Sequence, residues 1–320
     1  MQGLVTVFGG SGFIGSQVVR ALAKQGLRIR VAVRQPGRGY KLRMLGDVGQ
    51  IEVVQANIRV PGSIRRALEG AEAVVNLVGV LHEAGRQKFQ SVHVMGARNI
   101  AEAAAERGIA RFVQVSALGA DAESASKYAR TKAAAESVVR ALVPTATMVR
   151  PSVVFGQGDG FFNRFAAMAA MAPALPLIGG GETRFQPVFV GDVAAAVARC
   201  VVDPQTAGRV YELGGPAVYS FREILELVLK ETHRDRVLLP LPFPAASLLG
   251  SVVELAGVLI APPLTADQVE LLKTDNVVSA GAAGLAELGV QATAVEPILP
   301  TYLYRYRKGG QFAEAIAAEA

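Results

Sequence analysis

The sequence predicts an α/β fold: a doubly wound parallel sheet with helices on both faces and a smaller C-terminal lobe. The first observation is a glycine-rich turn that joins the apolar run Leu4–Phe8 to a helical pattern. The second is a regular alternation of short apolar runs with helical segments as far as Val149. Beyond that point prolines multiply and the alternation weakens. We therefore predict a core of residues 1–155 and a lobe of residues 156–320, interleaved rather than cleanly separated.

The glycine-rich turn has the chemistry of a phosphate-binding loop. Gly9 lets the chain turn, Gly12 lets the backbone approach a pyrophosphate, and Gly15 lets helix and strand pack closely. The helix N-terminus behind it offers free N–H groups and a partial positive charge. Between a strand and a helix, this loop predicts a Rossmann dinucleotide site that includes Phe13 and Ile14; a plain tight turn is the alternative. The GxxGxxG spacing resembles the short-chain dehydrogenase/reductase superfamily, in its extended and atypical branches.

Composition narrows the class of protein. The chain has 320 residues, 51% hydrophobic and 19% charged, so it can bury a large core and is not a disordered chain. Its net charge is +6, but scattered basic residues favour an anionic membrane surface, a polyanionic cofactor or an acidic protein over nucleic acid. A single cysteine, Cys200, permits no internal disulfide and fits a reducing compartment. His82, His93 and His233 lack metal-ligand spacing, so we predict no metal site.

The residues that follow the second predicted strand, Arg28–Val33, indicate which dinucleotide the site prefers. Dinucleotide sites for NAD place an acidic residue near the end of this strand, to hold the ribose hydroxyls. Here the strand ends in Arg34, with Arg38 and Lys41 close behind. A carboxylate would repel a 2′-phosphate, whereas a guanidinium pairs with it through two hydrogen bonds. The sequence therefore favours NADP(H) over NAD(H); solvated loop charges are the alternative.

Segments after the later strands resemble cofactor-lining segments of the superfamily. These strands are predicted at 51–55, 73–76, 111–115 and 146–149. The resemblance implies that the third strand leads to the adenine, the fourth to a segment that lines the cofactor, and the sixth to the nicotinamide. The residues so implied are Asn57, Ile58, Leu77, Val78, Gly79, Pro151, Val153 and Val154. In the helix after the fourth strand, His93 stands where extended members usually have Asn.

Tyr128 and Lys132 match the superfamily's YxxxK pair. Four residues apart on a helix, they share one face. A phenol has a reference pKa of about 10, and a neighbouring ammonium is expected to lower it. By resemblance the lysine also holds the nicotinamide ribose. The family's catalytic Ser/Thr lies one or two residues beyond Ser116, where Ala117 and Leu118 stand, so we predict a vestigial site with little turnover.

Two capping signals are predicted in the C-terminal half. Phe185–Ala194 resembles the extended branch's Val-x-Asp-Val-Ala signature, and Asp192 is expected to cap a helix beginning at Val193. Ser220 and Glu223 form a capping box.

The segment Phe243–Leu264 is almost wholly apolar, with Glu254 its only charge. About 17 helical residues span roughly 26 Å, less than a bilayer core of about 30 Å, so a transmembrane helix is disfavoured. Two readings stay open: an ordinary buried helix, or a helix packed on a membrane surface or a hydrophobic partner.

The C-terminal segments Leu272–Val277, Pro300–Leu303 and Arg305–Arg307 resemble the nucleotide-binding accessory subunit of respiratory complex I, the NADH:ubiquinone oxidoreductase. That family is an atypical short-chain dehydrogenase, and the resemblance runs from Gly9 to Arg307. It implies a peripheral subunit at the junction of the hydrophilic and membrane arms, holding NADPH tightly outside the electron path. The first strand begins three residues after Met1, without room for a signal peptide, which favours a bacterial form facing the cytoplasm over one in the mitochondrial matrix.

We therefore predict a structural NADPH-binding accessory subunit of complex I. The first alternative is an active NADPH-dependent reductase or epimerase, which Tyr128 and Lys132 favour and Ala117 and Leu118 oppose. The second is a soluble NADP(H)-sensing regulator, which the apolar segment 243–264 opposes.

Overall fold

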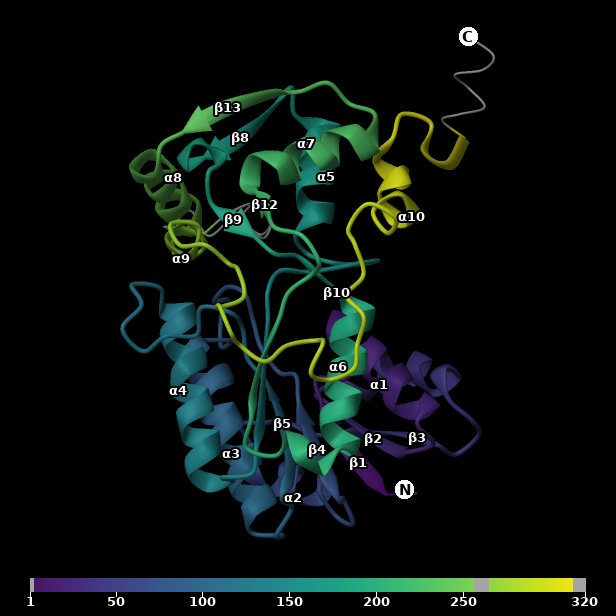
Figure 1. Cartoon of the computed structure of the whole chain (residues 1–320). Helices are drawn as coiled ribbons and strands as arrows, with labels where there is room; N and C mark the ends of the chain where they lie inside the picture. The colour runs from purple at the N-terminus through teal and green to yellow at the C-terminus, as the bar shows by residue number, and fades with distance from the viewer. Residues whose placement is uncertain (1–2, 256–264, 313–320) are drawn as a thin grey trace. The chain divides into compact units, whose positions relative to one another are not determined.

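The computed structural model describes residues 3–255 and 265–312, which fold into two compact units (Figure 1). The first unit comprises residues 1–151, 190–213 and 279–291. The second comprises residues 152–189, 214–278 and 292–320. Each unit is therefore assembled from three stretches of the chain.

The first unit is built on a seven-stranded sheet in which every neighbouring pair is parallel. The strand order is β11-β6-β5-β4-β1-β2-β3. This confirms the predicted doubly wound sheet; the sixth strand begins one residue later than predicted and ends two residues later. The strands are β1 Leu4–Phe8, β2 Arg28–Val33, β3 Ile51–Gln55, β4 Ala73–Asn76, β5 Arg111–Val115, β6 Thr147–Pro151 and β11 Val210–Leu213.

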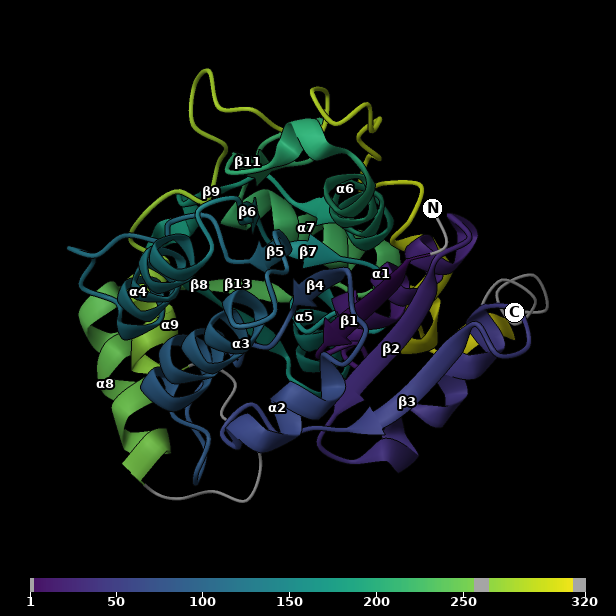
Figure 2. The same ribbon diagram turned by 90° about the horizontal axis from the view of Figure 1, so that it is seen from below.

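Helices cover both faces of this sheet, as Figure 2 shows. On one face α1 packs against α6, and on the other α3 packs against both α2 and α4. Side chains such as Phe112, Ile100 and Val139 fill the space between the strands and the helices α2, α3 and α4. Fully burying such a side chain stabilises the fold by about 1.5–3 kcal/mol. The helices are α1 Phe13–Lys24, α2 Pro61–Ala67, α3 Met95–Ala105, α4 Lys127–Leu142 and α6 Val190–Val202.

The start of α6 differs from the prediction. The helix begins at Val190, so Asp192 is its third residue and not its N-cap. The apolar face already starts at Val190, which is buried together with Val193 and Val197, and the helix extends back to include it. Asp192 lies in the first turn, where a carboxylate still interacts favourably with the positive end of the helix dipole.

The second unit contains three two-stranded sheets and a core rich in phenylalanine. β8 pairs with β13 and β7 with β10 in parallel, and β9 pairs with β12 antiparallel. Phe165 packs edge-on against Phe161 and Phe221 in the core. The strands are β7 Val154–Phe155, β8 Ala174–Ile178, β9 Arg184–Phe185, β10 Val188–Phe189, β12 Tyr219–Ser220 and β13 Val237–Leu241. The helices are α5 Phe162–Met171, α7 Phe221–Thr232, α8 Phe243–Leu255, α9 Ala266–Leu271 and α10 Pro300–Leu303.

The capping box at the start of α7 is confirmed. The Ser220 side chain accepts a hydrogen bond from the Glu223 N–H, and the Glu223 carboxylate accepts one from the Ser220 N–H. The helix ends at His233, whose φ of 51° places it in the left-handed region.

The apolar segment begins as helix α8, and its residues 256–264 lie outside the described part of the chain. Ala246 is buried, whereas Leu248 and Leu249 are 67% and 56% exposed. Within residues 3–255 and 265–312, no helix is both long enough and apolar enough to span a bilayer. Within residues 243–249 of α8, Ala246 is thus buried in the second unit while Leu248 and Leu249 are exposed.

Gly15→Ala tests the close packing at the start of α1. A Cβ at Gly15 would lie 2.3 Å from the Gly9 carbonyl oxygen, so the backbone must shift, and we expect the free energy of unfolding to fall by about 1–3 kcal/mol. Denaturant unfolding measures it. Gly62→Ala in α2 is the matched control, because its Cβ would meet only the end of Arg66 at 4.0 Å. That change should leave stability equal or raise it by up to about 1 kcal/mol; equal effects of the two changes would contradict the argument.

Candidate dinucleotide site

The glycine loop packs directly against the β4 loop, Leu77–Val80. Gly9 has a φ of 81°, and a Cβ there would lie 3.1 Å from the Leu77 carbonyl carbon. Gly12 is exposed and forms the N-cap of α1, which no side chain caps. The N-terminus of α1 thus presents backbone N–H groups, behind an exposed glycine, to an approaching anion.

The β4 loop also reaches the helix that carries the YxxxK pair. Buried Asn76 shapes the loop: its Oδ1 accepts from the Val78 N–H at 3.1 Å, and its Nδ2 donates to Gln114 at 2.9 Å. A Cβ at Gly79 would lie 3.2 Å from Lys132 Nζ. The structure therefore brings the glycine loop, the β4 loop and Lys132 together within the first unit.

Tyr128 and Lys132 lie on the first turns of α4, whose N-cap is Ser126. Lys132 Nζ lies 5.7 Å from the Tyr128 ring centroid and donates a hydrogen bond to the Val115 carbonyl. Burial lowers the pKa of Lys132 to about 8, against the opposing effect of Glu136. Burial raises the pKa of Tyr128 to about 12. The expectation that the lysine lowers the phenol pKa is thus wrong, because desolvation of the phenolate dominates.

Ser116 carries a buried hydroxyl that lacks a hydrogen-bond partner in the described part of the chain. It follows β5, is 4% exposed, and its N–H donates to the Val149 carbonyl. Within the described residues its Oγ has no hydrogen-bond partner, which is rare for a buried hydroxyl. Such an oxygen suits a polar group of a bound ligand, so the site fits a dinucleotide at this point as well as at the glycine loop.

The residues predicted for the adenosine end lie at the carboxyl ends of β2 and β3. Arg34 follows β2 directly, is exposed, and donates from Nη2 to Gln87 Oε1 at 3.3 Å. Asn57 uses its Oδ1 to accept the Arg59 N–H at 3.1 Å, so its side chain shapes the turn after β3. Ile58 is buried against Gly96 of α3.

The residues predicted beside the nicotinamide are divided between the two units. Pro151 ends β6 in the first unit, whereas Val153 and Val154 belong to the second. There Asn276 Oδ1 accepts hydrogen bonds from the Ser152 hydroxyl at 2.7 Å and from the Val153 N–H at 3.1 Å. The role of Val153 and Val154 in cofactor binding stays a prediction, while Asn276 is an anchor for this segment that the sequence did not indicate.

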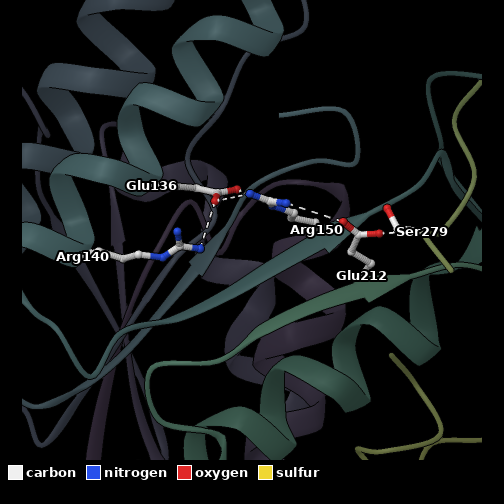
Figure 3. A network of polar contacts seen from close by, with 5 residues as sticks. All are labelled: Glu136, Arg140, Arg150, Glu212 and Ser279. Carbon is white, nitrogen blue, oxygen red and sulfur yellow. Dashed lines mark hydrogen bonds and ion pairs between the residues drawn. The ribbon is translucent and has the colours of Figure 1, made fainter. Parts of the chain in front are cut away.

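An ion-pair network centred on the buried side chain of Glu136 fixes α4 to the sheet (Figure 3). The Glu136 side chain is 3% exposed and binds Arg150 of β6 through two hydrogen bonds, at 2.8 and 2.7 Å, and Arg140 at 3.3 Å. Arg150 reaches on to Glu212 of β11 at 3.5 Å, and Glu212 accepts from the Ser279 N–H at 2.9 Å. The network joins the helix of Tyr128 and Lys132 to three other stretches of the first unit.

Known proteins with similar sequences identify the class. The fold and the site are those of a dinucleotide-binding α/β protein, and the chain belongs to the NAD dependent epimerase/dehydratase family, whose model matches residues 5–214. Within it, the chain belongs to the family of the complex I alpha subcomplex subunit 9. It is 35% identical to "NADH dehydrogenase (ubiquinone) 1 alpha subcomplex subunit 9, mitochondrial" of Arabidopsis thaliana over 97% of this chain and 80% of the relative. It is 31% identical to the "NADH-ubiquinone oxidoreductase 40 kDa subunit, mitochondrial" of Neurospora crassa over 96% of this chain and 80% of the relative.

A third relative is named as an enzyme. A ceramide reductase of Caulobacter vibrioides is 38% identical over 200 residues, which are 62% of this chain and 61% of that protein. Among solved structures, an NADPH-dependent quinone oxidoreductase from Escherichia coli complexed with NADPH is similar with a TM-score of 0.69 at 23% identity. That alignment covers 92% of this chain and 97% of the other and supports the fold alone.

Glu136→Gln tests the buried network. Arg150 would lose its bidentate carboxylate partner, so we expect the free energy of unfolding to fall by about 2–4 kcal/mol. Glu102→Gln in α3 is the control, because Glu102 makes an exposed ion pair with Arg98 at 3.7 Å. The control should cost no more than about 0.5 kcal/mol in the same denaturant titration. A Glu136→Gln protein as stable as the control would show that Arg150 finds an equal partner elsewhere.

Proposed function

We propose that this chain is a structural accessory subunit of complex I that holds NADP(H) and supports assembly and stability where the hydrophilic and membrane arms join. The observation that carries the proposal is the extent of similarity: relatives named as complex I subunits align with 95–98% of the chain. The glycine loop, the β4 loop and Lys132 lie together within the first unit, where a dinucleotide would bind.

NADP(H) is the cofactor that the residues favour. The glycine loop would hold the pyrophosphate, Arg34 the 2′-phosphate, and Lys132 the nicotinamide ribose. The exposed guanidinium of Arg34 has one neutral partner, Gln87, among its described hydrogen bonds, so a phosphate can approach it without displacing a carboxylate. A bound NADPH supplies a hydride; this chain's residues bind and orient it.

The acid–base chemistry of the site argues for a structural role. A phenol with a pKa of about 12 is about five units from neutrality, so Tyr128 is a poor proton donor and a poor base at pH 7. Ser116 is followed by half-buried Ala117 and buried Leu118, which offer no hydroxyl to a substrate carbonyl. These features favour retention of the cofactor over turnover.

We propose that the protein lies peripherally at the cytoplasmic face of the bacterial inner membrane, which corresponds to the matrix side of its mitochondrial relatives. Its partners would be complex I subunits, with an anionic membrane surface as a second contact for a chain of net charge +6. On the second unit, exposed Leu248 and Leu249 of α8 support docking through this helix.

An active NADPH-dependent reductase is the second candidate. The similarity to a ceramide reductase favours it, as does the intact Tyr128/Lys132 pair. The relatives that match nearly the whole chain favour the structural role instead.

Arg34→Gln tests the cofactor preference. Loss of a charge-assisted bond to the 2′-phosphate should weaken NADPH binding about ten- to a hundredfold and leave NADH binding unchanged. Isothermal titration with both cofactors measures this. Arg28→Gln is the matched control, since Arg28 is also exposed but begins β2, at the far end of the same strand. Equal affinity of the unmodified protein for NADPH and NADH would contradict the preference.

Tyr128→Phe separates the two candidate functions. For a structural subunit, membranes that carry the variant should oxidise NADH at nearly the unmodified rate, and NADPH should stay bound through purification. For a reductase, the purified protein should oxidise NADPH with a ceramide-like carbonyl substrate, and Tyr128→Phe should abolish that reaction. This second result would make us prefer the reductase.

Leu248→Asp with Leu249→Asp tests docking through α8. Two carboxylates on this helix should disfavour burial against a partner, so the protein should move from the membrane fraction, where it travels with complex I, to the soluble fraction. Met44→Asp in the first unit is the control, because Met44 is 79% exposed outside α8. NADPH binding is checked first in each variant. An unchanged distribution of the double variant would rule out α8 as the docking element.

A further inference from the structure

His93 lies at the centre of an aromatic cluster beside the dinucleotide site. It belongs to a π-helical turn, Gln90–Val94, that leads into α3, and it is 2% exposed. Its ring stacks on Phe89, with centroids 5.3 Å apart and planes at 24°. Its ring also meets the Tyr128 ring at right angles, with centroids 5.4 Å apart and planes at 87°. A π-helical turn costs helical regularity and often occurs at functional sites.

The hydrogen bonds of His93 join two separate elements. Nε2 lies 3.1 Å from the Val80 nitrogen in the β4 loop, and Nδ1 lies 3.0 Å from the Thr131 hydroxyl of α4. Nε2 lies equally near the Val80 carbonyl oxygen, at 3.1 Å, so the ring contacts the Val80 backbone either as an acceptor from its N–H or as a donor to its carbonyl. The Thr131 hydroxyl also lies within hydrogen-bond distance, 3.0 Å, of the Tyr128 carbonyl oxygen. In either neutral tautomer the ring joins the β4 loop to α4.

The surroundings of the ring keep it neutral. The titratable groups that face it are Lys132 and Tyr128, both from α4. Burial and the Lys132 charge lower the pKa of His93 to about 3, against the opposing effect of a hydrogen bond to the Val80 backbone. An imidazolium at this position would be desolvated and would repel Lys132.

His93 thus bridges the β4 loop and α4, and the position of this bridge gives the His93 ring a role beyond packing in the core. Val80 follows Gly79, and a Cβ at Gly79 would lie 3.2 Å from Lys132 Nζ and 3.7 Å from His93 Nε2. The ring thus fixes the β4 loop at the point where it meets the lysine. A phenylalanine would fill the same space and make neither hydrogen bond.

We propose that neutral His93 is a positioning residue, which holds the β4 loop and the Tyr128/Lys132 face of α4 as one preformed wall for the nicotinamide half of the cofactor. The inference rests on the proposed function, in which the site holds NADP(H). Without the His93 hydrogen bonds, the β4 loop and the start of α4 would have to become ordered when the cofactor binds. The loss of conformational entropy would then weaken cofactor binding.

His93→Phe tests this role with two ligands, NADPH and 2′-phospho-ADP-ribose, which lacks the nicotinamide. We expect the variant to bind NADPH roughly tenfold more weakly, because two half-buried partners lose their hydrogen bonds to the ring, and to bind the fragment unchanged. His93→Gln keeps an acceptor toward Val80 and should recover part of the NADPH affinity. Phe89→Leu is the matched control: it disturbs the same aromatic cluster without a hydrogen bond, so it should lower the melting temperature and leave both affinities within about twofold.

Three results would overturn the inference. The first is a His93→Phe protein that melts at a lower temperature but binds NADPH as tightly as the unmodified protein. That result would show that His93 only stabilises the fold. The second is an equal loss of affinity for the fragment. The third is a His93 ring that titrates near pH 6.5 in ¹⁵N NMR spectra, since the neutral form should persist from pH 8 to pH 5. Failure of the unmodified protein to bind NADPH or NADH would instead contradict the proposed function itself, and the inference with it.

Discussion

The bond between the buried carboxylate of Glu136 and the guanidinium of Arg150 is the interaction on which the site depends. It fixes α4 in register against β6, and the same carboxylate favours the charged form of Lys132, which lies one turn earlier on the helix. A buried pair adds little net stability compared with an apolar contact, but it tolerates few alternative arrangements. The pair therefore acts mainly on geometry: α4 cannot slide or rotate against β6 without breaking the two hydrogen bonds between Glu136 and Arg150.

Much of the first unit could be predicted from the sequence because its signals are local. A strand buried on both faces reads as a mostly apolar run, so Leu4–Phe8 was found with its bounds. Arg28–Val33 was also found with its bounds, although Arg28 and Arg30 interrupt its apolar residues. The glycine loop and the YxxxK pair are short motifs whose geometry follows from spacing alone, and so is the Ser220 capping box of the second unit. The start of α6 was misplaced because a capping residue and a first-turn acid look alike in sequence.

The rest could not be predicted because it depends on partners far apart in the chain. Glu136 and Arg150 are 14 residues apart, and the Ser152–Asn276 bond spans 124 residues. Nothing near Asn276 in the sequence indicates which backbone it holds. The high pKa of Tyr128 is likewise a consequence of burial, which depends on everything packed around the ring. The sequence showed His93 as an unlikely metal ligand and as a replacement for the Asn of extended members, but its bridge between Val80 and Thr131 becomes visible only in the fold.

The interleaving of the two units has a consequence for how the protein is made. The first unit is completed by residues 279–291, where the Ser279 N–H bonds Glu212 and the Ala283 carbonyl accepts from the Glu212 N–H. A chain emerging from the ribosome therefore exposes its first six parallel strands long before the last stretch of that unit has been synthesised. Parallel strands whose packing partners have not yet been synthesised expose unpaired edges and apolar surface, so they are prone to misfold or aggregate. The nascent polypeptide thus has a long interval in which a chaperone, or early capture of its dinucleotide, would protect it.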